Sequence, residues 1–300
     1  MDHSIDTVKR AFEHRFTGRI PRGEIWLGTD LFKKANLEDN LEGHIELVKR
    51  LGQDFLCLPL SHDISTNKAL GYRHFSLKEI EEASRISDLF LTAIIDGPFQ
   101  RLAEKNGLMK ILTRWKRERY EVAKEYEKER AEVDILITRC LELSVDSVII
   151  ADDLAGESST FVDPREIQDL FSSFYIQAVS KIHRGRSYAL FHSCGNIKGL
   201  VPQLLSFGFD GLAAIQHRTN DLIGLKEKYG SNLTLMAGID AEILEAGQIS
   251  LSGMKEFERL LKSLVSQGGF ILCSSSGLFS GEFFEKIEEL YRIADELFRD

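Results

Sequence analysis

The sequence predicts an α/β protein of the (β/α)8 class, a TIM barrel formed by a single domain over residues 1–300. Short apolar runs alternate with longer amphipathic or charged stretches, as in parallel strands joined by crossover helices. Eight such units fit in the chain, and no Pro-, Gly- or Ser-rich linker divides it. A doubly wound open sheet would give similar local signals, but the number of units favours the barrel.

Each predicted strand is a short run of apolar and β-branched residues. Runs such as LFLTAII and SVIIA are apolar throughout rather than alternating, which suits strands that are covered on both faces. The eight strands are expected at residues 24–28, 54–60, 88–95, 146–151, 187–192, 210–215, 233–238 and 269–273.

Helical patterns fill the intervals between these strands. The start at Asp163-Pro164 is marked clearly, because Asp can cap a helix and Pro suits its first turn. The helices are expected at about residues 38–51, 99–113, 116–143, 164–184, 197–207, 219–229, 240–247 with 252–267, and 280–298.

The composition excludes several classes of partner. Asp and Glu total 47 against 38 for Lys and Arg, and the resulting charge of −9 would repel a nucleic-acid backbone. The start of the chain lacks the pattern of a signal peptide, and no apolar run approaches the roughly 18 residues of a membrane span. Four scattered cysteines do not form a disulfide framework, so we expect a cytoplasmic protein with reduced thiols.

The strongest chemical signal is a His-x-Cys pair at the end of a predicted strand. His192 and Cys194 lie at positions i and i+2, so their side chains can point to one face of the chain. Cys273, at the end of the last predicted strand, could reach the same ion across the barrel mouth. Two thiolates and an imidazole suit zinc and leave a fourth position for water or substrate. The same residues also fit a metal-free barrel in which the cysteines are small apolar residues and His192 forms a local hydrogen bond.

Acidic residues follow two other predicted strands. Asp152 and Asp153 come directly after the strand at 146–151, where a barrel places functional side chains. They are candidates for positioning or protonating a substrate, or for holding a zinc-bound imidazole, and either could instead cap a loop. Asp240 follows the strand at 233–238 and could contact substrate or cap the next helix.

The order of several segments resembles that of the uroporphyrinogen decarboxylase superfamily. Within it, the chain is most similar to the zinc-dependent methyltransferases that work with corrinoid proteins. The similarity extends from Ile25 to about Tyr291. The segments concerned are DGPF at 96–99, DDLA at 152–155, FVDP at 161–164, FHSCGN at 191–196 and LMAGID at 235–240.

This resemblance implies a barrel whose site lies at the carboxyl ends of the strands and holds zinc through His192, Cys194 and Cys273. It also implies a corrinoid (cobalamin) that is carried by a partner protein. The expected reaction is transfer of a methyl group between that corrinoid and a small substrate, which is a methoxylated or methylated compound or a thiol. The sequence does not fix the direction of transfer.

Two departures keep alternative functions open. The decarboxylases bind a polycarboxylated substrate through an arginine after the first strand, whereas residues 26–30 here are WLGTD. Asp63, with His62 beside it, nevertheless lies near their essential aspartate, so a metal-free decarboxylase is one alternative. In the methyltransferase interpretation Asp63 is, like Asp152, a candidate catalytic residue that positions or protonates the leaving atom. Gln216 and His217 stand where some methyltransferases carry an acidic residue, and with His62 and Asp240 they are candidates for substrate binding. A non-catalytic barrel that binds a ligand or a corrinoid protein is the other alternative.

Overall fold

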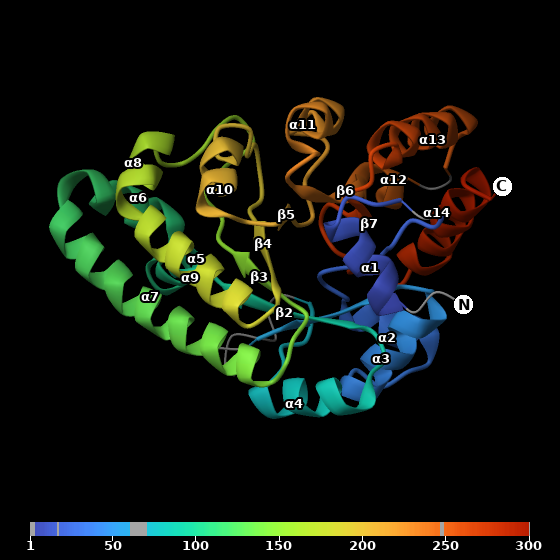
Figure 1. Ribbon diagram of the computed structural model, residues 1–300, viewed down its shortest axis with the longest axis horizontal. Coiled ribbons are helices and arrows are strands. Elements are labelled where there is room, and N and C mark those ends of the chain that lie inside the picture. Colours follow the sequence, from blue (N-terminus) through green and yellow to red (C-terminus); the bar gives the residue numbers. More distant parts are fainter. Residues whose placement is uncertain (1–3, 17, 61–70, 247–248, 300) are drawn as a thin grey trace.

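A curled, all-parallel sheet forms the centre of the computed structural model, which describes residues 4–16, 18–60, 71–246 and 249–299 (Figure 1). Within these residues the sheet has seven strands in sequential order, joined by helices. Sequential parallel strands with helical crossovers are the arrangement of a TIM-barrel-like fold. The strands are β1 (Phe55–Pro59), β2 (Phe90–Asp96), β3 (Ser147–Ala151), β4 (Tyr188–His192), β5 (Gly211–Leu212), β6 (Thr234–Ile239) and β7 (Phe270–Ser274).

Helices follow the strands and pack around the sheet (Figure 1). None of the helices within the described ranges combines the length and apolar character that a membrane crossing requires. The helices are α1 (Ser4–Phe12), α2 (Thr29–Ala35), α3 (Leu41–Arg50), α4 (Leu77–Ile86), α5 (Pro98–Asn106), α6 (Leu108–Arg117), α7 (Arg119–Glu142), α8 (Pro164–Leu170), α9 (Ser172–Arg184), α10 (Val201–Phe207), α11 (Leu222–Tyr229), α12 (Ala241–Glu245), α13 (Leu251–Val265) and α14 (Phe283–Leu297).

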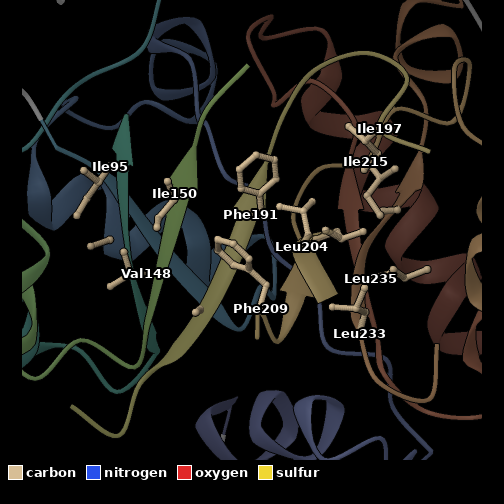
Figure 2. Packing of buried hydrophobic residues seen from close by; sticks show 14 of the residues in the cluster. Ile95, Val148, Ile150, Phe191, Ile197, Leu204, Phe209, Ile215, Leu233 and Leu235 are labelled. Atoms are coloured by element: carbon tan, nitrogen blue, oxygen red, sulfur yellow. The ribbon is translucent and has the colours of Figure 1, made fainter. Parts of the chain in front are cut away.

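The sheet has a buried cluster on each face, because successive side chains of a strand point in opposite directions. In β3, Val148 and Ile150 belong to the larger cluster, and Figure 2 shows them there with Phe191 of β4. Ile149 and Ala151 belong to a second cluster on the inner face. Both faces are therefore apolar, as the continuous apolar runs predict.

Helix α1 covers the amino ends of the strands. The ring of Phe12 stacks on that of Tyr188, at the start of β4, with centroids 4.1 Å apart. Phe12 also lies 6.0 Å from Phe90, at the start of β2. The amino end of the inner cluster is thus occupied by a helix, and the carboxyl end remains for a site.

The predicted first strand at 24–28 is not formed. Residues 21–23 do hydrogen-bond with both edge strands, because Leu272 of β7 pairs with Pro21 and Gly23, and Asp54, just before β1, donates to the carbonyl of Arg22. Beyond this point the pairing with β1 and β7 stops, and Leu27 and Gly28 form only isolated bridges, with Leu278 and Tyr72. The backbone N–H of Ser274 is bound by the side chain of Glu24, 3.0 Å away, instead of by a strand backbone.

Strand β5 is shorter than the predicted strand at 210–215. Its ladder ends at Leu212, and Ala214 adopts a left-handed conformation with φ +50 that turns the chain away. The helices expected at 99–113 and 164–184 are each divided in two, the first at Gly107, where φ is +86. The predicted start at Pro164 is confirmed, since the side chain of Asp163 accepts the N–H of Arg165.

Candidate functional site

Three donor atoms of the kinds that bind transition metals lie together beyond the carboxyl ends of β3 and β4. His192 is the last residue of β4, Cys194 follows it by two residues, and Asp153 lies two residues after β3. One nitrogen, one sulfur and one oxygen from these side chains all lie within 4.8 Å of one another. In the described part of the chain this is the only such set of three, and we call it the His192 group.

The imidazole of His192 is held in one tautomer. Its Nδ1 lies 2.8 Å from the carbonyl oxygen of Ala213, which can only accept, so Nδ1 bears the hydrogen. In the neutral ring the lone pair is then on Nε2, which lies 3.7 Å from Sγ of Cys194. In a tetrahedral zinc site, an imidazole nitrogen and a thiolate are about 3.6 Å apart. The spacing and the orienting carbonyl both suit a metal-binding histidine.

Hydrogen bonds from its backbone N–H groups and a close glycine contact hold the segment after β4 in place. The N–H of Cys194 donates to Oδ1 of Asp153 at 2.7 Å. Gly195 has φ +82, and a Cβ there would lie 2.4 Å from the carbonyl oxygen of Gly156, so only glycine fits. The N–H of Gly195 donates to Oε1 of Gln216 at 2.8 Å. These contacts fix the position of Cys194.

The surroundings of Cys194 disfavour the ionised form of its thiol when no cation is nearby. Burial, and after it the carboxylate of Asp153, raises the pKa of Cys194 to about 12. A thiol with this pKa remains protonated at neutral pH. A cation bound between the thiol and the carboxylate would reverse this, because it favours both ionised forms.

The His192 group opens into a cavity of about 230 Å³. This volume suits a small molecule rather than a large one. Near the metal-binding atoms, the ring of Trp26 meets that of His192 edge to face, with centroids 4.9 Å apart. The cavity is lined by Trp26, Tyr72, Asp96, Gln100, Glu104, Ala151, Asp153, His192, Cys194, Ser276 and Phe279.

Cys273, the third ligand that the resemblance implies, does not join the His192 group. Its side chain is fully buried, and two acceptors lie within reach of its single S–H, Oε2 of Glu24 at 3.8 Å and the carbonyl oxygen of Ser274 at 3.2 Å. The hydroxyl of Tyr291 also donates to Glu24, at 3.0 Å. Burial raises the pKa of Glu24 to about 7, against the effect of these hydrogen bonds. We call Glu24, Cys273, Ser274 and Tyr291 the Glu24 group.

Asp152, predicted to be catalytic, points away from the cavity. It is fully buried and accepts the Tyr175 hydroxyl at 2.7 Å and the backbone N–H of Gln100 at 2.6 Å. Gln100 lies in the first turn of α5, where backbone N–H groups have no acceptor within the helix. Asp152 supplies an acceptor to this helix end. Burial raises the pKa of Asp152 to about 7. Its contacts are those of a residue that joins β3 to α5.

The residues predicted to bind substrate are dispersed. Gln216 orients Gly195 and does not line the cavity. His217 and Asp240 line a different cavity of about 420 Å³, and Asp240 also caps α12 by accepting the N–H of Glu242. His62 and Asp63 lie outside the described residues.

Sequence reasoning missed the aromatic part of the cavity. Trp26 and Tyr72 lie in irregular segments, where side-chain spacing carries no directional signal. Glu24 was placed in a predicted strand, although a glutamate within an apolar run is itself a sign of a buried polar contact. Asp153 was predicted as a catalytic residue, and the structure places one of its carboxylate oxygens within 4.8 Å of the donor atoms of His192 and Cys194.

Comparisons with known proteins bear on the fold. No family model and no curated protein matches the sequence. Among solved structures, a methyltransferase from Methanosarcina mazei is 14% identical with a TM-score of 0.76, each chain being covered over 100% of its length. A protein described as a vitamin B12-independent methionine synthase from Listeria monocytogenes is 13% identical with a TM-score of 0.57, covering 94% of this chain and 97% of that one.

A D-psicose 3-epimerase is also similar, with 12% identity, a TM-score of 0.52 and coverage of 85% of this chain and 91% of that one. At such low identities the similarity establishes the fold alone. The chain is therefore an α/β protein with a TIM-barrel-like fold, and the chemistry has to be argued from the site itself.

Proposed function

We propose that this protein is a zinc-dependent methyltransferase. It would move a methyl group between a small methylated or methoxylated substrate, or a thiol, and a corrinoid carried by a partner protein. The observation that supports this proposal is the convergence of His192, Cys194 and Asp153 at the edge of a cavity of small-molecule size. Two solved structures of the same fold, described as a methyltransferase and a methionine synthase, agree with methyl transfer as the class of reaction.

The donor set fits zinc. Imidazole nitrogen, thiolate sulfur and carboxylate oxygen are its usual protein ligands, and three of them leave one position for substrate. We assign these ligands to His192, Cys194 and Asp153. The resemblance implies Cys273 instead of Asp153, and that assignment requires the Cys273 thiol to leave Glu24.

When bound, zinc would supply a Lewis acid that withdraws charge from the oxygen, nitrogen or sulfur bonded to the methyl group. The residues of the chain orient and enclose the substrate. The Ala213 carbonyl fixes the His192 ring, and Asp153 holds the backbone N–H of Cys194. The ring of Trp26 packs against His192 and shields this side of the site from water.

The cavity is poorly suited to the decarboxylase alternative. A substrate with several carboxylates needs clustered guanidinium or ammonium donors. The described lining of the cavity contains no Lys or Arg and does contain three carboxylates, those of Asp96, Glu104 and Asp153. Methyl transfer on a substrate without many negative charges is the better match.

The first experiment measures zinc and methyl transfer together. We expect one zinc per purified chain by mass spectrometry, and its loss in His192→Ala and Cys194→Ser. Cys140→Ser is the matched control, because this thiol is buried on α7, outside the cavity. Methyl transfer is followed by the cobalamin spectrum with methylcobalamin or cob(I)alamin and a panel of thiols, methoxyaromatics and methylamines. Zinc without any transfer would favour the non-catalytic barrel, and absence of zinc would refute the proposal.

Cobalt(II) substitution identifies the third ligand. Thiolate-to-cobalt charge-transfer absorption grows with the number of bound thiolates. With Asp153 as ligand we expect the intensity of one thiolate, unchanged in Cys273→Ser and altered in Asp153→Asn. The intensity of two thiolates, halved in Cys273→Ser, would instead support the ligand set implied by the resemblance.

A further inference from the structure

The segment between β5 and α11 contacts both sides of the His-x-Cys pair. The carbonyl of Ala213 accepts the imidazole N–H of His192. The side chain of Gln216 accepts the N–H of Gly195, which directly follows the cysteine of the pair. Between these two contacts Ala214, with φ +50, turns the chain. Strand β5 thus ends just where the chain begins to contact the His192 group.

Asn220, near the end of this segment, is bonded to the same part of the chain. Its Nδ2 donates to the carbonyl oxygens of Gly195 and Gln216, both at 2.9 Å. Its Oδ1 accepts the backbone N–H of Ile197 at 3.0 Å. A carbonyl oxygen can only accept and an N–H can only donate, so these partners fix the orientation of the amide. Only 6% of Asn220 is exposed, and water therefore competes little for these hydrogen bonds.

The backbone of Asn220 is itself held in place by the residues around it. Its N–H donates to the carbonyl of His217 at 3.3 Å. The next residue, Asp221, caps α11 by accepting the N–H of Gly224 at 3.0 Å. The side-chain amide of Asn220 is thus attached to the start of a helix, which gives it a defined position from which to hold the segment after β4.

The hydrogen bonds of Asn220 belong to a series that holds the chain around Cys194. Each of the four peptide groups between residues 193 and 197 forms a hydrogen bond with another segment. Asn220 bonds to two of them, those on either side of Asn196. Glycine can adopt many backbone conformations, so the φ of +82 at Gly195 has to be selected by such contacts. The position of the cysteine therefore depends on partners outside its own strand.

We propose that Asn220 is a positioning residue that holds Cys194 in the geometry of a metal ligand. This role rests on the proposed function, in which Cys194 binds zinc. Metal ligands are oriented by hydrogen-bonded groups behind them, and loss of such a group weakens metal binding by about 10-fold to 100-fold. Asparagine suits this position because one side chain provides an acceptor for an N–H and donors for two carbonyl oxygens. Aspartate has nearly the same shape but no donor.

The first measurement is zinc affinity by competition with a chromophoric chelator. We expect Asn220→Ala to bind zinc about 10-fold to 100-fold more weakly than the wild type. Asn220→Asp should lose nearly as much, because its carboxylate would face two carbonyl oxygens without a donor. Asn106→Ala is the matched control, since the amide of Asn106 bonds only to the carbonyl of Leu102 on α5, and it should bind zinc like the wild type. Unchanged zinc affinity in both Asn220 variants would overturn the proposal.

A second measurement separates positioning from general stability and requires no metal. Cys194 is partly exposed whereas the other three cysteines are buried, so a thiol reagent such as Ellman's reports on Cys194 in the folded protein. We expect metal-free Asn220→Ala to react at least about fivefold faster than the wild type without denaturant, because access to the thiol increases. Tyr175→Phe, which removes a buried hydrogen bond to Asp152, is the control for a variant that is only less stable. It should react at the wild-type rate.

Asn220→Asp, which keeps the size of the side chain, serves for both measurements if the alanine variant does not fold. An unchanged rate of thiol modification in the Asn220 variants would overturn the proposal, as unchanged zinc affinity would.

The two proposals can fail separately. Zinc binding and methyl transfer in the wild type, with equal zinc affinity in Asn220→Ala, would overturn the role of Asn220 and leave the methyltransferase intact. Faster modification of Cys194 in Asn220→Ala, in a protein that binds no zinc, would refute the proposed function and still support the contact of Asn220 with the Cys194 segment as the one that positions this thiol.

Discussion

The His192 group and the Glu24 group both combine a cysteine with a carboxylate near the carboxyl ends of the strands, but their surroundings differ. Cys194 is partly exposed to a cavity, and the nearby imidazole Nε2 presents a lone pair. Cys273 is fully buried and its thiol is hydrogen-bonded to Glu24. The carboxylate of Glu24 already accepts hydrogen bonds from Ser274 and Tyr291.

This difference separates a binding site from a structural contact. A ligand site needs donor atoms whose electron pairs are not fully used within the protein and which a ligand can reach. The His192 group meets both conditions. The Glu24 group meets neither in this structure, and its hydrogen bonds join the segment before α2 to β7 and α14.

The largest expected effect distinguishes the two cysteines. Cys194→Ser should weaken zinc binding at least about 100-fold, because it removes a thiolate ligand. Cys273→Ser should change zinc affinity less than about threefold, because the Cys273 thiol bonds to Glu24. The affinities can be measured by competition with a chromophoric chelator. Equal losses in both variants would mean that Cys273 leaves Glu24 to bind the metal.

A second comparison concerns the neighbouring acids after β3. Asp152→Ala should lower the free energy of unfolding by about 3 kcal/mol, since it leaves the buried Tyr175 hydroxyl and the Gln100 N–H without their acceptor. Asp153→Ala should cost less than about 1 kcal/mol in the metal-free protein, because its side chain is partly exposed. Urea unfolding with chelator present measures both values. A larger loss for Asp153 would show that it too is structural.

The pH dependence of stability tests the burial of Glu24. Its pKa is about 7 in the folded protein against 4.5 ordinarily, so between these values the unfolded chain releases a proton that the folded chain keeps. The contribution of Glu24 is therefore complete below pH 4.5 and is lost as the pH rises to about 7, with a total near 3 kcal/mol. Glu24→Gln should remove this part of the decline. Asp152 adds a decline of the same sign, so the remaining slope is not zero.

The smallest expected effect concerns the support of the His192 group. Gln216→Ala removes the acceptor of the Gly195 N–H and should weaken zinc binding about threefold to tenfold. Gln216→Glu keeps an acceptor oxygen and should bind zinc nearly as well as the wild type. Chelator competition measures both variants. An unchanged affinity in Gln216→Ala would show that the segment after β4 keeps its position without this contact.

Much of the fold could be predicted because it depends on local patterns. Seven of the predicted strands are formed, at positions close to those expected, because each is an apolar run covered on both faces. The strand at 24–28 failed because the side chain of Glu24 takes the N–H of Ser274, a contact between residues 250 positions apart. Such a contact leaves no periodic signal in the sequence.

The site could be predicted only where its residues are close neighbours in the sequence. His192 ends β4 and Cys194 follows two residues later, and this spacing predicts that their side chains lie together. Asp153 joins the site because the loop after β3 packs against the loop after β4. Tyr72 reaches the cavity from an irregular segment that is distant in the sequence from both loops. The direction of a side chain in a loop is set by tertiary contacts, which is also why Asp152 and Asp153 point to different places despite being adjacent.

The contact between Trp26 and His192 gives the protein an intrinsic optical probe. The chain has two tryptophans, and Trp115 lies among the helices against Phe171, away from the cavity. A Trp115→Phe variant would keep Trp26, which contacts His192, as its only tryptophan. Quenching of the Trp26 fluorescence by paramagnetic cobalt(II) would then report metal binding to the His192 group in real time, without any label.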